Sequence, residues 1–225
     1  MSYRSGVIAG VIGTAVVAGA GGRSFVSGAD ISQFEKTRAT PEQREVSEKI
    51  RGRGRAAIAN FGKPTIAMVR GYCLGAGLNV ALLCDLRVAS DDAKFGVPAA
   101  KLGVGYGYET SKLISDLVGP AFGKEMLFTG RHFDAHEALR IGLVNRVVPG
   151  DQLEQAVKTW TDAIGANAPL SVAAAKLAFD AAILDPAERN LAAVDAAVER
   201  AMNSDDFKEG RRAFMERRKP VFRGA

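Results

Sequence analysis

Two glycine-flanked alanines stand out as places where the backbone can approach a ligand. One lies in Gly28-Ala29 and the other in Gly75-Ala76-Gly77, which opens a segment long enough for a helix. Glycine has no Cβ, so neighbouring N–H groups can come close to a bound molecule, and a helix N-terminus favours negative charge. Glycines of this kind also make simple tight turns, so the pattern alone does not identify the ligand.

The sequence does not match the motifs of several other kinds of site. The cluster from Gly19 to Ser24 has the form G-x-G-x-x-S, and the sequence contains no G-x-x-x-x-G-K-[ST] and no G-x-S-x-G, so dinucleotide, P-loop and nucleophile-elbow sites are not supported. His132 and His136 have no partner at metal-ligand spacing, which predicts surface histidines and no metal. Cys73 and Cys84 lie in an apolar stretch, which predicts core thiols in a reducing compartment.

Composition narrows the class of protein. The chain has 225 residues, of which 47% are hydrophobic and 24% charged. That is enough to bury one sizeable core with an appended helical piece, and it excludes disorder, collagen and coiled coil. The net charge is +5, and basic residues crowd the segment 211–223. This segment is predicted to be a solvated helix face or a site for nucleic acid, a membrane surface or a phosphorylated small molecule.

The glycine loops need strands and helices to hold them. The apolar run 6–20 imitates a targeting signal but is too short to span a bilayer, and it is interpreted as a buried strand over 12–17 that leads into a glycine cluster. Thr40-Pro41-Glu42-Gln43 predicts a helix start, and Gly52 and Gly54 predict a weakened or kinked middle of that helix. A strand over 65–69, a glycine turn, a helix over 75–84 and a strand over 86–89 follow. The alternation predicts an α/β unit with parallel strands and a ligand at the strand-to-helix turns.

The second half of the chain is increasingly helical. Helices are predicted over 109–117 and 120–128, separated by Gly119-Pro120, and another from Asp134 to Gly142. A strand over 143–148 follows, and from Asp151 the pattern is helical, with breaks at Pro186 and Gly210. The predicted organisation is a core over 1–150 and a C-terminal helical region over 151–225.

Several segments, in this order along the chain, resemble the enoyl-CoA hydratase/isomerase (crotonase) superfamily. They include Ser24 to Ile31, Lys63 to Ala67, Gly71 to Gly77 and Cys84 to Arg87; three further segments are 128–130, 142–149 and 209–220. The resemblance runs from about residue 12 to the end. It implies a crotonase-like spiral of ββα units followed by C-terminal helices. The family's first strand and its Asn-Ala-Leu segment would precede residue 12, so we expect either that the chain is shortened at its N-terminus or that its start is misassigned. Part of that segment helps to hold the CoA diphosphate in the family, so the resemblance implies a weaker hold on that group here.

The resemblance also implies a chemistry, stabilisation of a thioester enolate by two backbone N–H groups. Motif matching assigns these donors to Ala29 and Ala76. It implies no cofactor beyond the coenzyme A of an acyl-CoA substrate. The residues expected to bind substrate and CoA are Ser27, Gly28, Asp30, Ile31, Gly75, Phe214 and Arg217.

The acid/base positions depart from the family pattern. Family hydratases carry two glutamates, and the matching residues are Asn79 and Ala99. Asparagine can hydrogen-bond a water or a carbonyl but cannot take a proton at neutral pH, and alanine can do neither. Hydration by two glutamates is therefore not supported. Tyr106 matches a functional tyrosine of methylmalonyl-CoA decarboxylases or is simply packed in the glycine loop, and Glu109 is either catalytic or a first-turn glutamate favoured by the helix dipole.

The basic tail gains an interpretation from the resemblance. In the family the C-terminal helix places an aromatic residue against adenine and a cation near the CoA phosphates, and the matches are Phe214 and Arg217; guanidinium suits phosphate. We expect a cytoplasmic homotrimer or hexamer that binds an acyl-CoA thioester and neither nucleic acid nor membrane. A binding protein that kept the fold and lost turnover, and an RNA-binding relative, are the competing classes.

Overall fold

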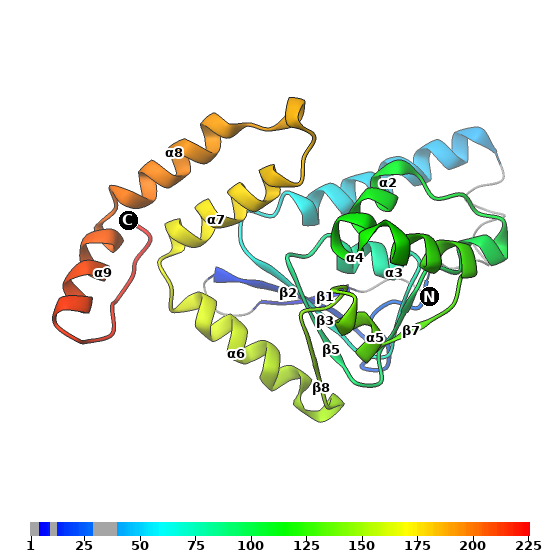
Figure 1. Ribbon diagram of the computed structural model, residues 1–225, viewed down its shortest axis with the longest axis horizontal. Coiled ribbons are helices and arrows are strands. Elements are labelled where there is room, and N and C mark those ends of the chain that lie inside the picture. Colours follow the sequence, from blue (N-terminus) through cyan, green and yellow to red (C-terminus); the bar gives the residue numbers. More distant parts are fainter. Residues whose placement is uncertain (1–4, 10–12, 29–39) are drawn as a thin grey trace. The chain divides into compact units, whose positions relative to one another are not determined.

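The computed structural model describes residues 5–9, 13–28 and 40–225 (Figure 1). Within this part the chain forms two compact units. The first contains most of the described residues up to 157, and the second contains 158–225 together with residues 9, 13–15 and 62–64. The predicted division after residue 150 stays a prediction.

A five-stranded sheet forms the centre of the first unit. Its order is β1 (Ser5–Ala9), β2 (Ala15–Gly19), β3 (Thr65–Val69), β5 (Leu86–Ser90) and β8 (Arg146–Val148), with β3, β5 and β8 parallel. Ile66, Ala67, Val88 and Ala89 are completely buried, as expected for parallel strands covered on both faces. The sequence predicted no strand before residue 12, and β1 is therefore an addition to the expected fold.

A second, three-stranded sheet consists of β4 (Tyr72–Leu74), β6 (Lys94–Gly96) and β7 (Phe133–Asp134). The chain passes from β3 to β4, then through helix α3 (Ala76–Leu82) to β5 and β6. β4 and β6 are parallel, so each turn places one strand in each sheet before a helix. This confirms the expected spiral of ββα units.

The helices of the first unit begin and end mostly where the sequence predicts. The Thr40 hydroxyl and the Gln43 side chain form a capping box at the start of α2 (Pro41–Ala59). A kink at Gly52 and Gly54 is wrong, because α2 runs unbroken through both residues, whereas a weakened middle stays a prediction. The predicted break at Gly119 is confirmed, since this residue has a φ of 76° inside α4 (Tyr108–Thr129). Helix α5 (Ala135–Arg140) and the 3-10 helix η3 (Pro98–Leu102) complete this unit.

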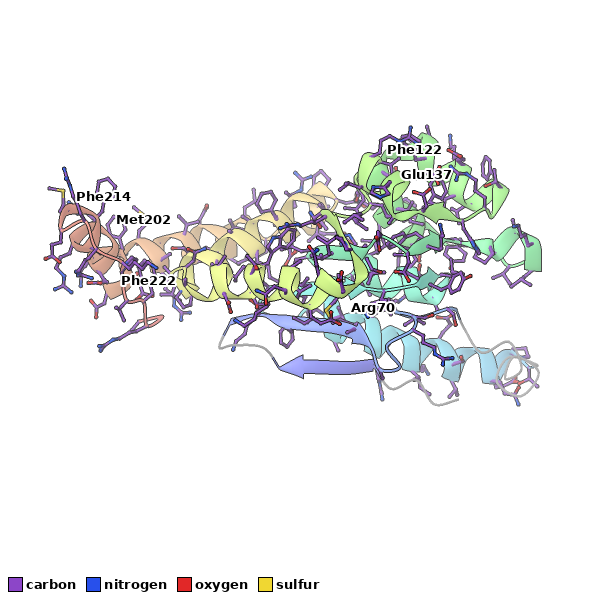
Figure 2. All side chains as sticks on the ribbon, turned by 90° about the horizontal axis from the view of Figure 1, so that it is seen from below. Arg70, Phe122, Glu137, Met202, Phe214 and Phe222 are labelled. Atoms are coloured by element: carbon purple, nitrogen blue, oxygen red, sulfur yellow. The ribbon has the colours of Figure 1, made fainter. Side chains whose placement is uncertain are left out.

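Four longer helices follow β8: α6 (Leu153–Gly165), α7 (Pro169–Ala182), α8 (Leu191–Met202) and α9 (Asp205–Met215), with short 3-10 turns η4 (Gly150–Gln152) and η5 (Pro186–Glu188). The predicted break at Gly210 is wrong. Gly210 lies inside α9, and a Cβ added there would lie 3.5 Å from the ring of Phe222, which Figure 2 labels. The ring is near because the tail folds back, with the N–H groups of Arg223 and Gly224 donating to Asp206. None of the described helices is long and apolar enough to cross a membrane.

The Cys84-to-Arg87 motif holds the core together. Asp85 Oδ2 accepts hydrogen bonds from Thr65 N at 2.7 Å and Thr65 Oγ1 at 2.9 Å, which ties the start of β3 to β5. The buried Arg87 guanidinium donates to the carbonyls of Leu143 at 2.8 Å and Cys84 at 2.7 Å, and burial lowers its pKa. The motif is therefore structural in this chain.

Candidate active site

The second glycine loop begins α3 in a conformation that suits glycine. Gly75 has a φ of 52° and donates its N–H to Gly96 O at 2.9 Å. Ala76 is the first residue of α3, where helix geometry leaves an N–H without an intrahelical partner. A Cβ on Gly77 would lie 2.2 Å from Val26 O, so this position also requires glycine. Ala76 therefore presents a backbone donor at a helix N-terminus.

The first glycine segment lies alongside the second. Val26 N donates to Tyr72 O at 3.1 Å and Leu74 N donates to Val26 O at 2.9 Å, so the segment runs parallel to β4. Gly28 follows with a φ of 127°, and Ser27 is exposed. The two glycine segments are thus neighbours, as a two-donor site requires. Ala29, Asp30 and Ile31 lie outside the described residues, and their roles stay predictions.

Asn79 and Tyr106 meet beside this loop. The Asn79 amide donates a hydrogen bond to the Tyr106 hydroxyl, and burial raises the pKa of Tyr106 although that bond lowers it. The hydroxyl oxygen is 3.9 Å from the position a Cβ of Gly75 would occupy. Asn79 Oδ1 is buried and accepts no hydrogen bond from the described residues. A buried acceptor of this kind is expected to bind a water or a ligand donor.

A cavity of about 340 Å³ opens next to Asn79. Most of its lining residues belong to three helices, α2, α3 and α4, which Figure 1 labels. We call it the α2–α4 cavity, and the residues that line it are Gly52, Arg55, Ala56, Ala59, Asn79, Leu83, Glu109, Thr110 and Leu113.

Glu109 lies in the first turn of α4 at the rim of this cavity. Its Oε2 accepts a hydrogen bond of 3.4 Å from Arg55 Nη2, and its side chain is 81% exposed. The Glu109 carboxylate therefore lies at the same cavity as Asn79 and is paired with the Arg55 guanidinium. Arg55 lies 54 positions earlier in the chain and was not among the predicted site residues.

Ala99 lies in η3 with only 8% of its surface exposed and packs into the hydrophobic core. The methyl group therefore fills a buried position from which no proton can be transferred. Whether this position faces the substrate stays a prediction.

Phe214 and Arg217 belong to the second unit, and their expected contacts with CoA stay predictions. Phe214 is 82% exposed on α9 (Figure 2). Arg217 is exposed just after this helix and has a φ of 54°, uncommon for a residue with a side chain. Other tail cations have partners, since Arg212 and Arg218 donate to Glu209. Together with the Val221 N–H, they hold the pKa of Glu209 well below its usual range.

The two histidines and the two cysteines lie where the sequence predicts them. His132 and His136 are exposed, and Cys73 and Cys84 are buried, as predicted. Burial raises the pKa of the Cys73 thiol. Among the residues with described positions, no three metal-ligating side chains gather in one place.

Comparison with known proteins agrees with this architecture. The chain is 36% identical to an enoyl-CoA hydratase/carnithine racemase from Magnetospirillum magneticum, with a TM-score of 0.88 over 95% of this chain and 79% of that structure. The fold is therefore that of the crotonase class.

The sequence comparisons identify the family more closely. The chain is 35% identical to the short-chain-enoyl-CoA hydratase of Clostridium acetobutylicum, over 91% of this chain and 77% of that protein. It is 37% identical to the (E)-benzylidenesuccinyl-CoA hydratase of Thauera aromatica, over 95% and 82%. The sequence model of the enoyl-CoA hydratase/isomerase family matches residues 10–225. The chain belongs to the enoyl-CoA hydratase/isomerase family.

Proposed function

We propose that the protein is an acyl-CoA enzyme that stabilises a thioester enolate with the backbone N–H groups of Ala76 and Ala29. The observation that carries the proposal is the second glycine loop, where Gly75 and Gly77 hold Ala76 at a helix N-terminus. Helix geometry leaves the N–H of such a first residue without an intrahelical partner. Donors fixed in this way need no reorganisation when charge develops on the thioester oxygen, and one such donor contributes about 2.7–4 kcal/mol.

Hydration through two glutamates does not fit the side chains at this site. Asn79 supplies an amide and Ala99 a methyl group, and neither transfers a proton at neutral pH. What the site does supply is hydrogen bonding, through the Tyr106 hydroxyl and the unpartnered Asn79 Oδ1. Both groups are neutral, so they can orient a substrate without repelling an anion.

Thioester binding is tested by calorimetric titration of the full chain with crotonyl-CoA, free CoA and an RNA oligomer. We expect crotonyl-CoA to bind more tightly than free CoA, and the RNA not to bind. A folded sample that binds no thioester would overturn the proposal, and binding without turnover of any thioester would assign the chain to binding proteins.

The Tyr106–Asn79 pair favours a second candidate, decarboxylation of a malonyl- or methylmalonyl-type thioester. The bond from the α-carbon to the carboxylate breaks, CO₂ leaves, and the electron pair forms the enolate, which then takes a proton from water. No general base is needed, so the route suits a site without glutamates. We expect decarboxylation to be faster than enoyl hydration, and a product assay with the reverse order would retire this candidate.

We also infer assembly into a homotrimer or hexamer. Phe214 and Met215 on α9 are 82% and 81% exposed, and large apolar side chains gathered at a surface are typical of protein contacts. Light scattering should give an oligomer, and a stable monomer with full activity would contradict the inference.

A further inference from the structure

We propose that the α2–α4 cavity selects acyl chains that end in a free carboxylate, and that Arg55 binds this carboxylate. This inference rests on the proposed function, because it assumes that the cavity receives the acyl group. It adds a substrate class that neither the glycine loops nor the Tyr106–Asn79 pair specifies.

The cavity has apolar walls and one charged pair. Ala56, Ala59, Leu83 and Leu113 contribute apolar surface suited to methylene groups. Of the described residues that line it, Arg55 is the sole cation and Glu109 the sole anion. Its volume of about 340 Å³ is at the small end of the range for ligand sites, which favours a short chain.

Arg55 has capacity to spare for a second anion. Its contact with Glu109 is a single hydrogen bond of 3.4 Å, whereas a guanidinium carries five N–H donors and binds carboxylates through two parallel bonds. Glu109 is 81% exposed against 40% for Arg55, so the glutamate can turn into water at little cost when a substrate anion arrives. An acyl chain that ends in a methyl group has no anion to take the place of Glu109 beside Arg55.

The carboxylate should be at the far end of the chain. Asn79 lies three residues after Ala76 on α3 and lines the cavity, so the carbons next to the thioester fall beside these two residues. Arg55 belongs to a different helix, α2, and reaches the first turn of α4. A CoA phosphate is the other anion that Arg55 could meet, and the experiment separates the two.

The test compares glutaryl-CoA with valeryl-CoA, which have the same chain length and the same CoA but differ in the terminal group. Calorimetry on the full chain should show that glutaryl-CoA binds about tenfold more tightly, as expected for a partly exposed charge-assisted pair. Arg55→Gln should abolish this preference and leave valeryl-CoA binding nearly unchanged. Glu109→Gln removes the competing anion and should increase the preference for glutaryl-CoA.

Arg53→Gln is the matched control, because Arg53 is an exposed arginine on the same helix that does not line the cavity. This variant should keep the wild-type preference. If wild type binds both thioesters equally, or if Arg55→Gln keeps the preference, the inference is overturned and the proposed function stands. An equal loss for both thioesters in Arg55→Gln would overturn it too, by assigning Arg55 to the CoA phosphates. Absence of binding by either thioester to folded wild type would overturn the proposed function itself.

Discussion

Returning glutamates to positions 79 and 99 should create hydratase activity. Wild type is expected to hydrate crotonyl-CoA very weakly, because both proton-transfer groups are absent. One positioned group contributes about 10²- to 10⁴-fold, or about 2.7–5.4 kcal/mol of barrier. Asn79 already lines the cavity with an oxygen that accepts no hydrogen bond from the described part of the chain, so Asn79→Glu places a carboxylate where a water can be held. Ala99 is 8% exposed, so burial should raise the pKa of a carboxyl introduced there and make it a usable acid.

We expect the double variant Asn79→Glu/Ala99→Glu to exceed wild type by about 100-fold, the contribution of one group, because the buried 99 position must repack to admit the second. The assay is the loss of enoyl-thioester absorbance with crotonyl-CoA. Asn79→Gln/Ala99→Gln is the control, since it adds the same bulk without a proton-transfer group. Robust hydration by wild type that survives Glu109→Gln and Tyr106→Phe would refute the reasoning, and so would a folded double variant no faster than the glutamine control.

Three further predictions follow from the same contacts. Ala76→Pro removes one backbone donor and should weaken binding of an enolate analogue by about 100-fold, whereas unchanged affinity in a folded variant would remove Ala76 from the site. Arg87→Met deprives three buried carbonyls, those of Ala81, Cys84 and Leu143, of charge-assisted hydrogen bonds and should cost about 3 kcal/mol, seen as a melting temperature lower by about 6–12 °C. An unchanged melting temperature would contradict this role. Because arginines depress the pKa of Glu209, its contribution to tail order is complete above the unfolded pKa near 4.5 and is lost as pH falls below it. The protection of amides over 218–225, measured relative to the intrinsic exchange rate at each pH, should therefore fall in acid for wild type. It should depend less on pH in Glu209→Gln, and equal protection profiles would contradict the prediction.

Local signals in the sequence predicted much of the fold because they act over a few residues. Thr40 and Gln43 satisfy each other's backbone donors, and Gly119 breaks α4 wherever the rest of the chain lies. Gly52 and Gly54 are also local signals, but they are too weak to bend α2. A glycine destabilises a helix by only about 1 kcal/mol relative to alanine, and a capped helix rich in good helix formers stays folded despite that loss. The short strands β4, β6 and β7 have no periodicity to detect.

The candidate site was only partly accessible from the sequence. Gly75, Ala76 and Asn79 lie within one helical turn and are adjacent in any fold that forms α3. Tyr106 reaches them only because η3 and its loop return to α3. Arg55 meets Glu109 across 54 positions and two helices, and neither residue type nor spacing could predict that contact.

The pairing of Tyr106 with Asn79 has a consequence for any chemistry at this site. Burial raises the pKa of the phenol, so at neutral pH it stays protonated and can donate its O–H while accepting the Asn79 amide. The site therefore holds two neutral groups where the family pattern has a carboxylate. An anion that develops on the thioester, or one carried by the acyl chain, meets no repulsion from them. Hydration, in contrast, needs a group that accepts a proton from water, and neither of these neutral side chains can do so near pH 7. The same substitution that removes the hydratase base thus makes the site more tolerant of acidic acyl groups, which is the property that Arg55 would use.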